Sequence, residues 1–377
     1  MTLRERMEAV FRGETPDAMA WFGDLTYWYG AHKEIGDLPE RWQGERGIGQ
    51  LHRDYNVGEY VPGCRAYHTL EGDKVGYEFS CNDGVQTRKW KSPVGTLTER
   101  SEYSAPSMSW GIVEHPIKNV SDLRILRFIM ENRQYVPCPE EIEKIDRDYG
   151  DFGLPVLAVP GTPITELNKT WTGVMDFCYL LADEPVEVRK TLDAIAESQE
   201  RIMRITEENN CRYIMVCENL TGETMGGYFD EYMRDYLTMY TDRLHSCDKK
   251  VMIHIDGTLH GALDKIAVTG IDCVDAVTPK PVGDVAVEDL RAMAGPDILL
   301  LGGIPGAMFA TPFNAKSMEK HVREIIRIHK DSGKFMLGVA DQVPPNGDIG
   351  LVKLISGHRD VQLRLCRILP SLHRSCR

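Results

Sequence analysis

The sequence lacks an apolar run of the roughly 18 residues that a membrane-spanning helix needs. It also lacks an excess of basic residues. Against 57 aspartates and glutamates stand 44 lysines and arginines, which gives a formal net charge of -13. An acidic chain repels the phosphate backbone of DNA and RNA. We therefore expect neither a membrane nor a nucleic acid among its partners.

Paired cysteine motifs are missing as well. The ten cysteines are scattered at irregular spacings, and no C-x-x-C pair occurs among them. This usage is typical of free thiols rather than of a disulfide framework, so we expect a cytoplasmic protein. No glycine-rich dinucleotide fingerprint follows an early strand, which argues against an open, doubly wound sheet.

What the chain does contain is a regular alternation of apolar runs and helical segments. Buried strands are expected at 19–23, 154–159, 212–217, 251–255, 271–275, 298–302 and 335–339, with an eighth around 110–135. Helices are expected at 2–12, 120–149, 163–182, 184–209, 226–246, 258–268, 286–294, 315–331 and 348–366. This alternation predicts parallel β/α units. We expect an α/β fold, a (β/α)8 TIM barrel formed by residues 1–377 as a single domain.

Residues 60–104 break this alternation. The runs 67–70, 76–79 and 85–90 alternate polar with apolar residues, and turn residues separate them. This pattern is typical of antiparallel hairpins. We expect a β-rich insertion here, an N-terminal β-hairpin excursion from the barrel rather than an independent domain. The basic end of the chain, 369–377, is expected to be a disordered tail.

Two expected strands end in residues that could bind a metal ion. His254 and Asp256 lie two residues apart in the run 251–257, so their side chains face the same side. Glu218 ends the preceding expected strand. Polar side chains at the C-terminal ends of barrel strands lie where chemistry is done, and imidazole with carboxylate suits zinc. The alternative is a hydrogen-bonded core histidine, with Asp256 as the cap of the following helix.

A third acidic residue ends the last expected strand. Asp341 is followed by Pro344-Pro345, and the fixed backbone of these prolines should hold the loop after Asp341 rigidly. Three roles are open for Asp341. It could bind the metal, orient His254 from behind, or merely cap the next helix.

Aromatic residues cluster at the first expected strand. Trp21, Tyr27 and Trp28 fall within a few residues of one another. They could form the wall of a pocket for a flat apolar ligand, because aromatic side chains offer a large rigid surface. The alternative is that they pack as a lid over the barrel mouth.

These motifs occur in a familiar order. The run 154–173, the strand ending in Glu218, the run 251–257, the turn 302–305 and the Pro344-Pro345 pair follow one another as in the uroporphyrinogen decarboxylase superfamily, which the chain resembles. The resemblance implies a (β/α)8 barrel and makes a homodimer compatible with the fold. That superfamily holds the decarboxylase and also corrinoid-dependent methyltransferases that carry zinc.

The residues separate the branches of that superfamily. The decarboxylase ends its first strand in an arginine-rich loop, whereas 21–28 contains Asp24 and no arginine, a poor host for a polycarboxylate. Methyltransferases that serve coenzyme M hold zinc by His-x-Cys and a later cysteine. Here the pattern is His254-x-Asp256, and 302–306 has no cysteine. The chain is more similar to the O-demethylase methyltransferases of anaerobic bacteria.

The resemblance implies a specific reaction. A methyl group would leave an aryl methyl ether and pass to the Co(I) of a corrinoid protein. The implied site has zinc held by Glu218, His254 and Asp256, with Asp341 assisting the departing phenolate and Trp21, Tyr27 and Trp28 stacking on the ring. The sequence lacks an Asp-x-His-x-x-Gly signature, so cobalamin is expected on a separate partner protein. The alternatives are a porphyrinogen decarboxylase, a non-catalytic tetrapyrrole or corrinoid carrier, and a methyltransferase with coenzyme M or another methyl donor.

Overall fold

The computed structural model describes residues 1–60, 64–224 and 227–358. The chain divides into two compact units. The first contains Met1–Cys64, Ile142–Ala158 and Cys211–Arg377, and the second contains Arg65–Glu141 and Val159–Asn210. The single-domain organisation and the insertion at 60–104 stay predictions. The helix expected at 348–366 is present over 350–358, and its remainder and the expected tail at 369–377 lie outside the described residues.

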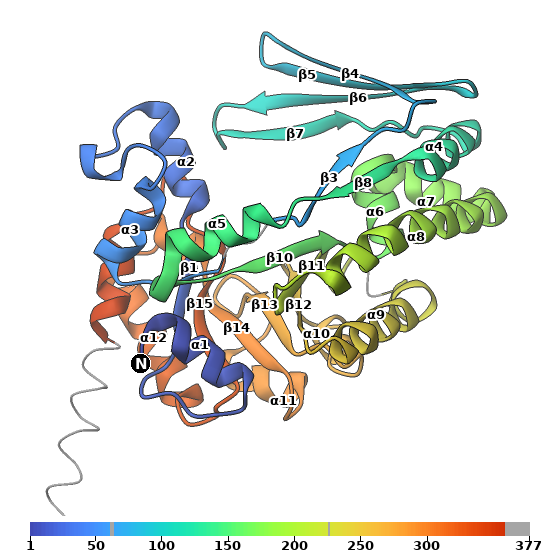
Figure 1. The fold of residues 1–377 in the computed structure, drawn as a ribbon. Helices are drawn as coiled ribbons and strands as arrows, with labels where there is room; N and C mark the ends of the chain where they lie inside the picture. Colours follow the sequence, from blue (N-terminus) through green and yellow to red (C-terminus); the bar gives the residue numbers. More distant parts are fainter. Residues whose placement is uncertain (61–63, 225–226, 359–377) are drawn as a thin grey trace, which may run out of the picture. The chain divides into compact units, whose positions relative to one another are not determined.

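A curled parallel sheet of seven strands forms the centre of the first unit (Figure 1). The strands are β1 (Trp21–Asp24), β10 (Val156–Pro160), β11 (Tyr213–Leu220), β12 (Lys250–Ile255), β13 (Cys273–Val277), β14 (Leu299–Pro305) and β15 (Phe335–Gln342). Their order in the sheet is β1-β15-β14-β13-β12-β11-β10. All seven strands expected from apolar runs are therefore present, and the sheet is that of a TIM-barrel-like fold.

The eighth strand expected around 110–135 is wrong. This range contains the end of the antiparallel strand β7 (Ser109–Glu114), the helix α4 (Val120–Asn132) and part of the strand β8 (Gln134–Pro137). None of these elements belongs to the seven-stranded sheet. Helix α4 is amphipathic and starts at an Asn119 capping box. Both features are sequence signals for a helix, and they explain why no barrel strand forms here.

A short segment near residue 60 instead pairs with both edge strands of the sheet. The parallel pairings of this segment join Phe22 to Gly58, Glu59–Tyr60 (β2) to Gly153–Leu154 (β9), and Cys64 to Leu157. The complete eight-stranded closure stays a prediction, because residues 61–63 lie outside the described part.

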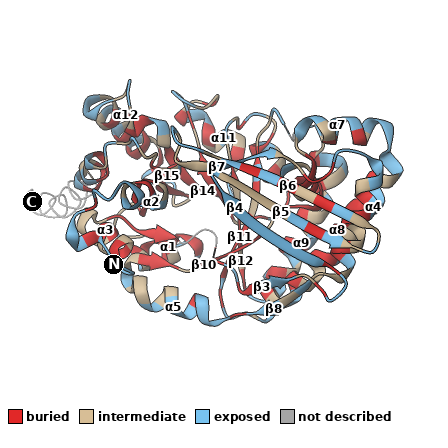
Figure 2. Ribbon diagram, turned by 90° about the horizontal axis from the view of Figure 1, so that it is seen from above, coloured by how far each residue is buried: buried red, intermediate tan, exposed pale blue. Residues whose placement is uncertain are grey.

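The interior of the curled sheet is apolar along most of its length. Its buried cluster includes Phe22, Met215, Met252, Leu301 and Met336, and β14 and β15 are coloured as buried in Figure 2. Side chains two residues apart on a strand face the same way. His254 and Asp275, two residues after Met252 and Cys273 of this cluster, therefore face the same interior, which positions the site described below.

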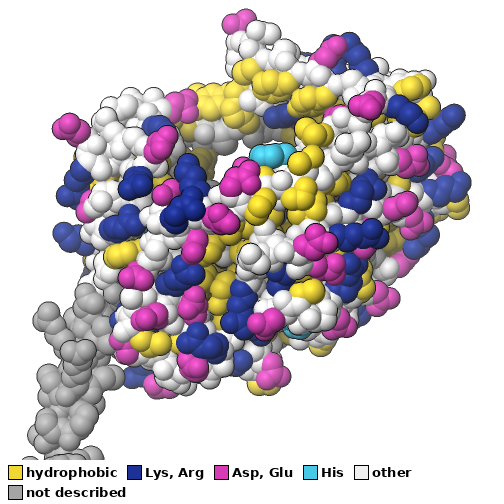
Figure 3. Space-filling view, in the orientation of Figure 1, with side chains coloured by type: hydrophobic (Ala, Val, Ile, Leu, Met, Phe, Trp, Pro, Cys, Tyr) yellow, Lys and Arg dark blue, Asp and Glu magenta, His cyan; other side chains and the backbone are white. Residues whose placement is uncertain are grey.

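Helices of the first unit follow the strands or lie near the N-terminus. They are α1 (Leu3–Phe11), α2 (Thr26–Ile35), α3 (Gly47–Tyr55), α9 (Arg234–Ser246), α10 (Leu263–Ile266), α11 (Leu290–Ala294) and α12 (Ala315–His329), while α5 (Glu140–Tyr149) begins in the second unit. Among the described helices, none combines the length and apolarity required to cross a bilayer. Acidic and basic side chains are interspersed on the face that Figure 3 shows.

The second unit contains antiparallel strands and helices. The strands β4 (Gly76–Asn82), β5 (Val85–Ser92), β6 (Gly95–Ser104) and β7 pair in chain order, and β3 (Tyr67–Leu70) pairs with β8. Its helices are α4, α6 (Pro163–Glu166), α7 (Val174–Asp183) and α8 (Pro185–Glu208). Arg127 of α4 donates to the Glu187 carboxylate of α8 at 2.8 Å, which joins two of these helices.

Candidate metal centre

Three possible metal ligands converge at the C-terminal ends of β12 and β15. Nε2 of His254 lies 3.4 Å from Oδ1 of Asp256 and 3.9 Å from Oδ1 of Asp341. One ligand atom from each of the three residues lies within 4.8 Å of the others. The His254 side chain is 17% exposed, so it can be reached while most of the ring is packed.

A buried hydrogen-bond chain fixes the other side of the imidazole. Nδ1 of His254 lies 2.8 Å from Oδ2 of Asp275, and Oδ1 of Asp275 accepts from the Tyr60 hydroxyl at 2.9 Å. Asp275 and Tyr60 are almost completely buried. A carboxylate on Nδ1 keeps the proton there and leaves the Nε2 lone pair free for a cation, the usual arrangement behind a metal-bound histidine.

The backbone is strained where these strands end. Ala276 has a φ angle of 62°, which alanine rarely adopts, and Asn219 and Asp341 have φ angles of 51° and 63°, in a region that their residue types visit more often. They lie in or directly at the C-terminal parts of β11, β13 and β15. The ladder register also shifts between Cys217 and Leu220. Strain that is held by surrounding structure is concentrated at functional sites.

The electrostatics of the cluster favour a cation. Burial raises the pKa of Asp341 to about 6, and repulsion from Asp256 adds to the rise. Burial by itself would lower the pKa of His254, but its contacts with Asp256 and Asp275 raise it well above the ordinary value. Negative charge is thus crowded around one imidazole.

A further buried carboxylate lies at the end of β1. Asp24 accepts from the Thr26 backbone N–H at 2.7 Å and from Nε2 of Gln342 at 2.8 Å. Burial raises its pKa, and Asp275 adds to the rise. Asp24 also adds to the raised pKa of Asp341, so its charge acts on the same cluster.

The cluster fits a divalent cation such as zinc. Bonds near 2.1 Å in tetrahedral geometry place ligand atoms about 3.4 Å apart. The separations of 3.4 and 3.9 Å from Nε2 are close to this value. One imidazole and two carboxylates form a borderline-to-hard donor set, which zinc accepts with a fourth position left open for another ligand.

A comparison with known families identifies the family of the chain. The sequence pattern of the family described as uroporphyrinogen decarboxylase (URO-D) matches residues 104–356, more than half of the chain. The chain belongs to the uroporphyrinogen decarboxylase family. All three residues of the cluster lie within the matched range. No curated protein matches the chain.

Solved structures show that this family member shares its fold with a methyltransferase. A protein described as a methyltransferase from Methanosarcina mazei is 15% identical, with a TM-score of 0.63 over 96% of this chain and 99% of that chain. An octameric ribulose-1,5-bisphosphate carboxylase/oxygenase from Pyrococcus horikoshii is 11% identical over 63% of this chain and 48% of that chain. Its TM-score is 0.29.

Glu218 lies beside the cluster of this URO-D family member but is not one of its three residues. The register pairs Cys217, the residue before it, with His254. Side chains alternate along a strand, so a regular β11 would turn residue 217 toward the face of His254 and residue 218 away from it. Glu218 is buried, and the ladder becomes irregular there. Its role as a ligand stays a prediction.

The structure places the three aromatic residues in different surroundings. Trp21 is 1% exposed, and its indole N–H donates to the Ser356 hydroxyl at 3.1 Å. Trp28 is 6% exposed, and its N–H donates to the Gly347 carbonyl at 3.1 Å. Tyr27 is half-buried. Packing therefore accounts for both tryptophans, and a contact with substrate stays a prediction for all three.

Sequence reasoning missed the residues that support the ligands. Asp275 was available as a signal, because it is a lone carboxylate in the apolar run Cys273–Val277. A buried charge requires a partner, and that requirement points to a nearby imidazole. Asn219, whose Nδ2 donates to Oδ2 of Asp256 at 2.7 Å, had no such signal. Tyr60 had none either, because it lies far from Asp275 in the sequence.

Proposed function

We propose that this member of the family is a zinc-dependent methyltransferase. It cleaves an aryl methyl ether and passes the methyl group to the Co(I) of a corrinoid protein. The observation that carries the proposal is the oxygen-rich cluster of His254, Asp256 and Asp341, with Nε2 of His254 directed at both carboxylates. The fold that the chain shares with a protein described as a methyltransferase supports the proposal.

The residues of the cluster have separate roles. His254, Asp256 and Asp341 hold the zinc, Asp275 keeps His254 in the required tautomer, and Asn219 orients Asp256. When bound, zinc supplies a Lewis acid for an ether oxygen that becomes negatively charged. A thiol acceptor would favour a thiolate-rich zinc, whereas this donor set suits an oxygen ligand.

The proposed reaction balances without an external oxidant. The bond between the methyl carbon and the ether oxygen breaks, and its electron pair stays on the oxygen as a phenolate. The methyl carbon forms a bond to cobalt, which supplies the electron pair and changes from Co(I) to Co(III). A phenol has a pKa of about 10, so its anion leaves poorly without help. Asp341 would be deprotonated as a zinc ligand, so in this proposal it holds the metal, and the bound zinc would stabilise the anion.

The surroundings of the cluster support the remaining parts of the proposal. We assign the contact with the ring to Tyr27 rather than to Trp21 or Trp28, because Tyr27 is half-buried while both tryptophans are buried. None of the eight described cysteines forms a disulfide, which supports a cytoplasmic location. We also propose that the sheet closes as a (β/α)8 barrel and that the chain forms a homodimer.

The test is a metal analysis followed by an anaerobic transfer assay. Cob(I)alamin is mixed with the purified full chain and a panel of methoxylated aromatics, and the cobalt spectrum is recorded. We expect zinc in the protein, formation of methylcobalamin, and an equal amount of phenol. Transfer that persists after complete removal of the metal would overturn the zinc assignment. A panel without any active methoxyaromatic would overturn the substrate assignment.

Decarboxylation of a porphyrinogen is the second candidate, and the family match favours it. Such a substrate carries several carboxylates and needs cationic partners. The first strand and the start of its following helix, 21–28, contain the buried Asp24 and no arginine, which weighs against it. Release of CO2 from added porphyrinogen would favour this candidate over methyl transfer.

A further inference from the structure

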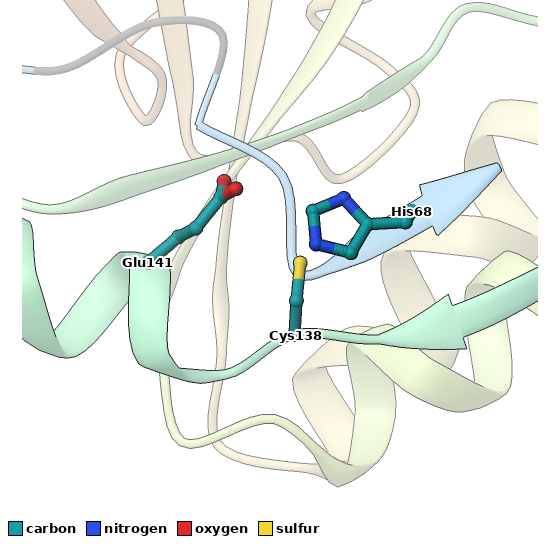
Figure 4. Close-up of side chains that lie close together, drawn as sticks. All are labelled: His68, Cys138 and Glu141. Carbon is teal, nitrogen blue, oxygen red and sulfur yellow. The ribbon is translucent and has the colours of Figure 1, made fainter.

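A second group of possible metal ligands lies in the second unit, separate in sequence from the residues discussed above. His68, Cys138 and Glu141 each offer one atom, and these atoms lie within 4.8 Å of one another. Figure 4 shows the three side chains directed toward a common space, from β3, from the residue after β8 and from the first turn of α5. The proposed transfer reaction uses none of these residues.

The antiparallel ladder brings His68 and Cys138 together. Tyr67 pairs with Pro137 and His68 with Val136, and the Cys138 backbone N–H extends the ladder by donating to the Ala66 carbonyl at 2.7 Å. In this register His68 and Cys138 are diagonal neighbours on one face of the two strands. Diagonal side chains are about 7 Å apart at their origins, within reach of an imidazole and a thiol.

Helix α5 supplies the third side chain. The helix begins at Glu140, so Glu141 lies in its first turn, three residues after Cys138. Pro139 between them restricts the backbone and limits the positions that Glu141 can adopt. The ligands therefore come from two strands and a helix start whose relative placement is set by a ladder and a short connection.

The three side chains have the chemistry of a zinc site. Magnesium and calcium prefer oxygen ligands, so a thiolate disfavours both ions at this site. A mixed set of sulfur, nitrogen and oxygen ligands suits zinc. The Cys138 thiol is buried, and its Sγ donates weakly to the Arg65 carbonyl at 3.6 Å. Burial raises the pKa of this thiol, and Glu141 and Glu140 raise it further. A cation bound between the thiol and Glu141 would lower the pKa of the thiol and favour the thiolate.

We propose that His68, Cys138 and Glu141 bind a zinc ion, with water in the fourth position. The ion is structural. His68 and Glu141 lie near the two ends of the segment Arg65–Glu141 of the second unit, so the ion joins the start of this segment to its end. A cross-link that closes a long segment removes conformational freedom from the unfolded chain. The proposal is independent of the methyl-transfer function, because it uses other residues in another unit.

Zinc content of the full chain is the first test. The protein is freed of metal by a chelator under reducing conditions, reconstituted with zinc and dialysed. We expect about two zinc ions per wild-type chain, one for each ligand group. His254→Ala and Cys138→Ser should each retain about one, and the double variant should retain none. One ion in the wild type that is lost with His254→Ala and kept with Cys138→Ser would overturn this proposal while leaving the first intact.

Cobalt(II) distinguishes the two groups by their ligands. Only a site with a thiolate gives sulfur-to-cobalt charge-transfer absorption. We expect this absorption in the wild type and in His254→Ala, and we expect Cys138→Ser to lack it. Cys81→Ser is the matched control, because Cys81 is an exposed free thiol in β4 of the same unit. Equal absorption in Cys138→Ser and Cys81→Ser would overturn the assignment.

A variant at an exposed residue tests the site even if Cys138→Ser fails to fold. His68 is exposed, so His68→Gln should leave the apoprotein folded. We expect it to bind zinc at the second group at least about tenfold more weakly than the wild type, because one of three protein ligands is gone. The double variant His68→Gln/His254→Ala should also lose the thermal stabilisation that added zinc gives to His254→Ala. Unchanged zinc affinity in a folded His68→Gln chain would overturn the proposal.

Discussion

Each of the two ligand groups contains three residues, but the groups differ in the residues that hold their side chains in place. His254 lies at the end of a parallel strand, with Asp275 and Tyr60 behind its ring and left-handed backbone at Asp341. His68 lies on a two-stranded antiparallel ladder, and no carboxylate hydrogen-bonds to it among the described residues. An oriented imidazole next to crowded carboxylates is suited to bind a cation that acts on substrate. A group containing a thiol on a ladder is suited to join chain segments.

Burial makes the same distinction. In the first group the ring of His254 is mostly packed, while the Asp341 side chain is 59% exposed and accessible to a ligand. In the second group the thiol of Cys138 is buried, while His68 and Glu141 are exposed. The first arrangement leaves an open side for chemistry. The second places its strongest zinc ligand where solvent cannot compete, which favours retention of the ion over turnover.

The largest effect is expected from removal of the imidazole of the first group, His254. His254→Ala should abolish metal binding there and lower methyl transfer by at least about a thousandfold, since both the Lewis acid and its main nitrogen ligand are lost. Metal content and the anaerobic assay measure the two effects. His260→Ala is the control, because His260 is exposed and pairs with Asp284 instead. A His254→Ala chain that transfers methyl groups without metal would erase the distinction between the two groups.

A smaller effect is expected from the carboxylate behind the ring. Asp275→Asn should weaken zinc binding at the first group about 10–100-fold, because the imidazole loses its fixed orientation and part of its basicity. Zinc titration of each apoprotein measures the affinity. Asp272→Asn is the matched control just before the start of the same strand, since Asp272 pairs with Lys250 and His245 and not with His254. Equal affinities in the two variants would indicate that Asp275 has only a structural role.

Asp341→Asn should stabilise the metal-free protein while weakening the site. The folded-state pKa of Asp341 is about 6 against an ordinary 3.8, so its ionisation disfavours the folded state. The stability that protonated Asp341 contributes is present below about pH 4 and is lost as the pH rises through about 6. At pH 7 the variant should gain about 1 kcal/mol, a value reduced because the side chain is largely exposed.

Chemical denaturation of the apoproteins at pH 4 and pH 7 measures this effect. Most of the gain should be lost at pH 4, because Asp341 is then neutral in the folded protein and only partly ionised in the unfolded chain. Asparagine also tolerates left-handed backbone, so the substitution adds no strain there. Asp348→Asn is a control in the loop after β15. A gain that is the same at both pH values would show that charge is not its cause.

The fold could be predicted further than the site. Seven apolar runs identified seven parallel strands, because burial on both faces leaves a strong signal in the sequence. The ends of those strands carry no comparable signal. His254 and Asp256 were recognised together because β12 is regular up to Ile255. Asp341 was recognised from its place after a strand, but its left-handed φ depends on the surrounding structure and could not be predicted.

Contacts between segments that are distant in sequence were also out of reach. The strand segment near Tyr60 was missed because β2 has only two residues, too few to form a pattern. The hydrogen bond from Tyr60 to Asp275 could therefore not be predicted either. The group of His68, Cys138 and Glu141 could not be predicted either. His68 lies far from the other two in the sequence, and the pairing of β3 with β8 brings it close to them.

The smallest effect is expected at the residue for which sequence and register disagree. The sequence prediction makes Glu218 a zinc ligand, whereas the register pairs Cys217 with His254. If the alternation of side chains decides, Glu218→Gln should change zinc affinity at the first group by less than about threefold, since the amide keeps the size of the buried side chain. Zinc titration measures this, with Cys217→Ala as the neighbouring control. A loss as large as that of His254→Ala would show that the irregular ladder after Cys217 turns Glu218 inward as a fourth ligand. The first group would then have four protein ligands and no open position for an ether oxygen, which would contradict the proposed reaction.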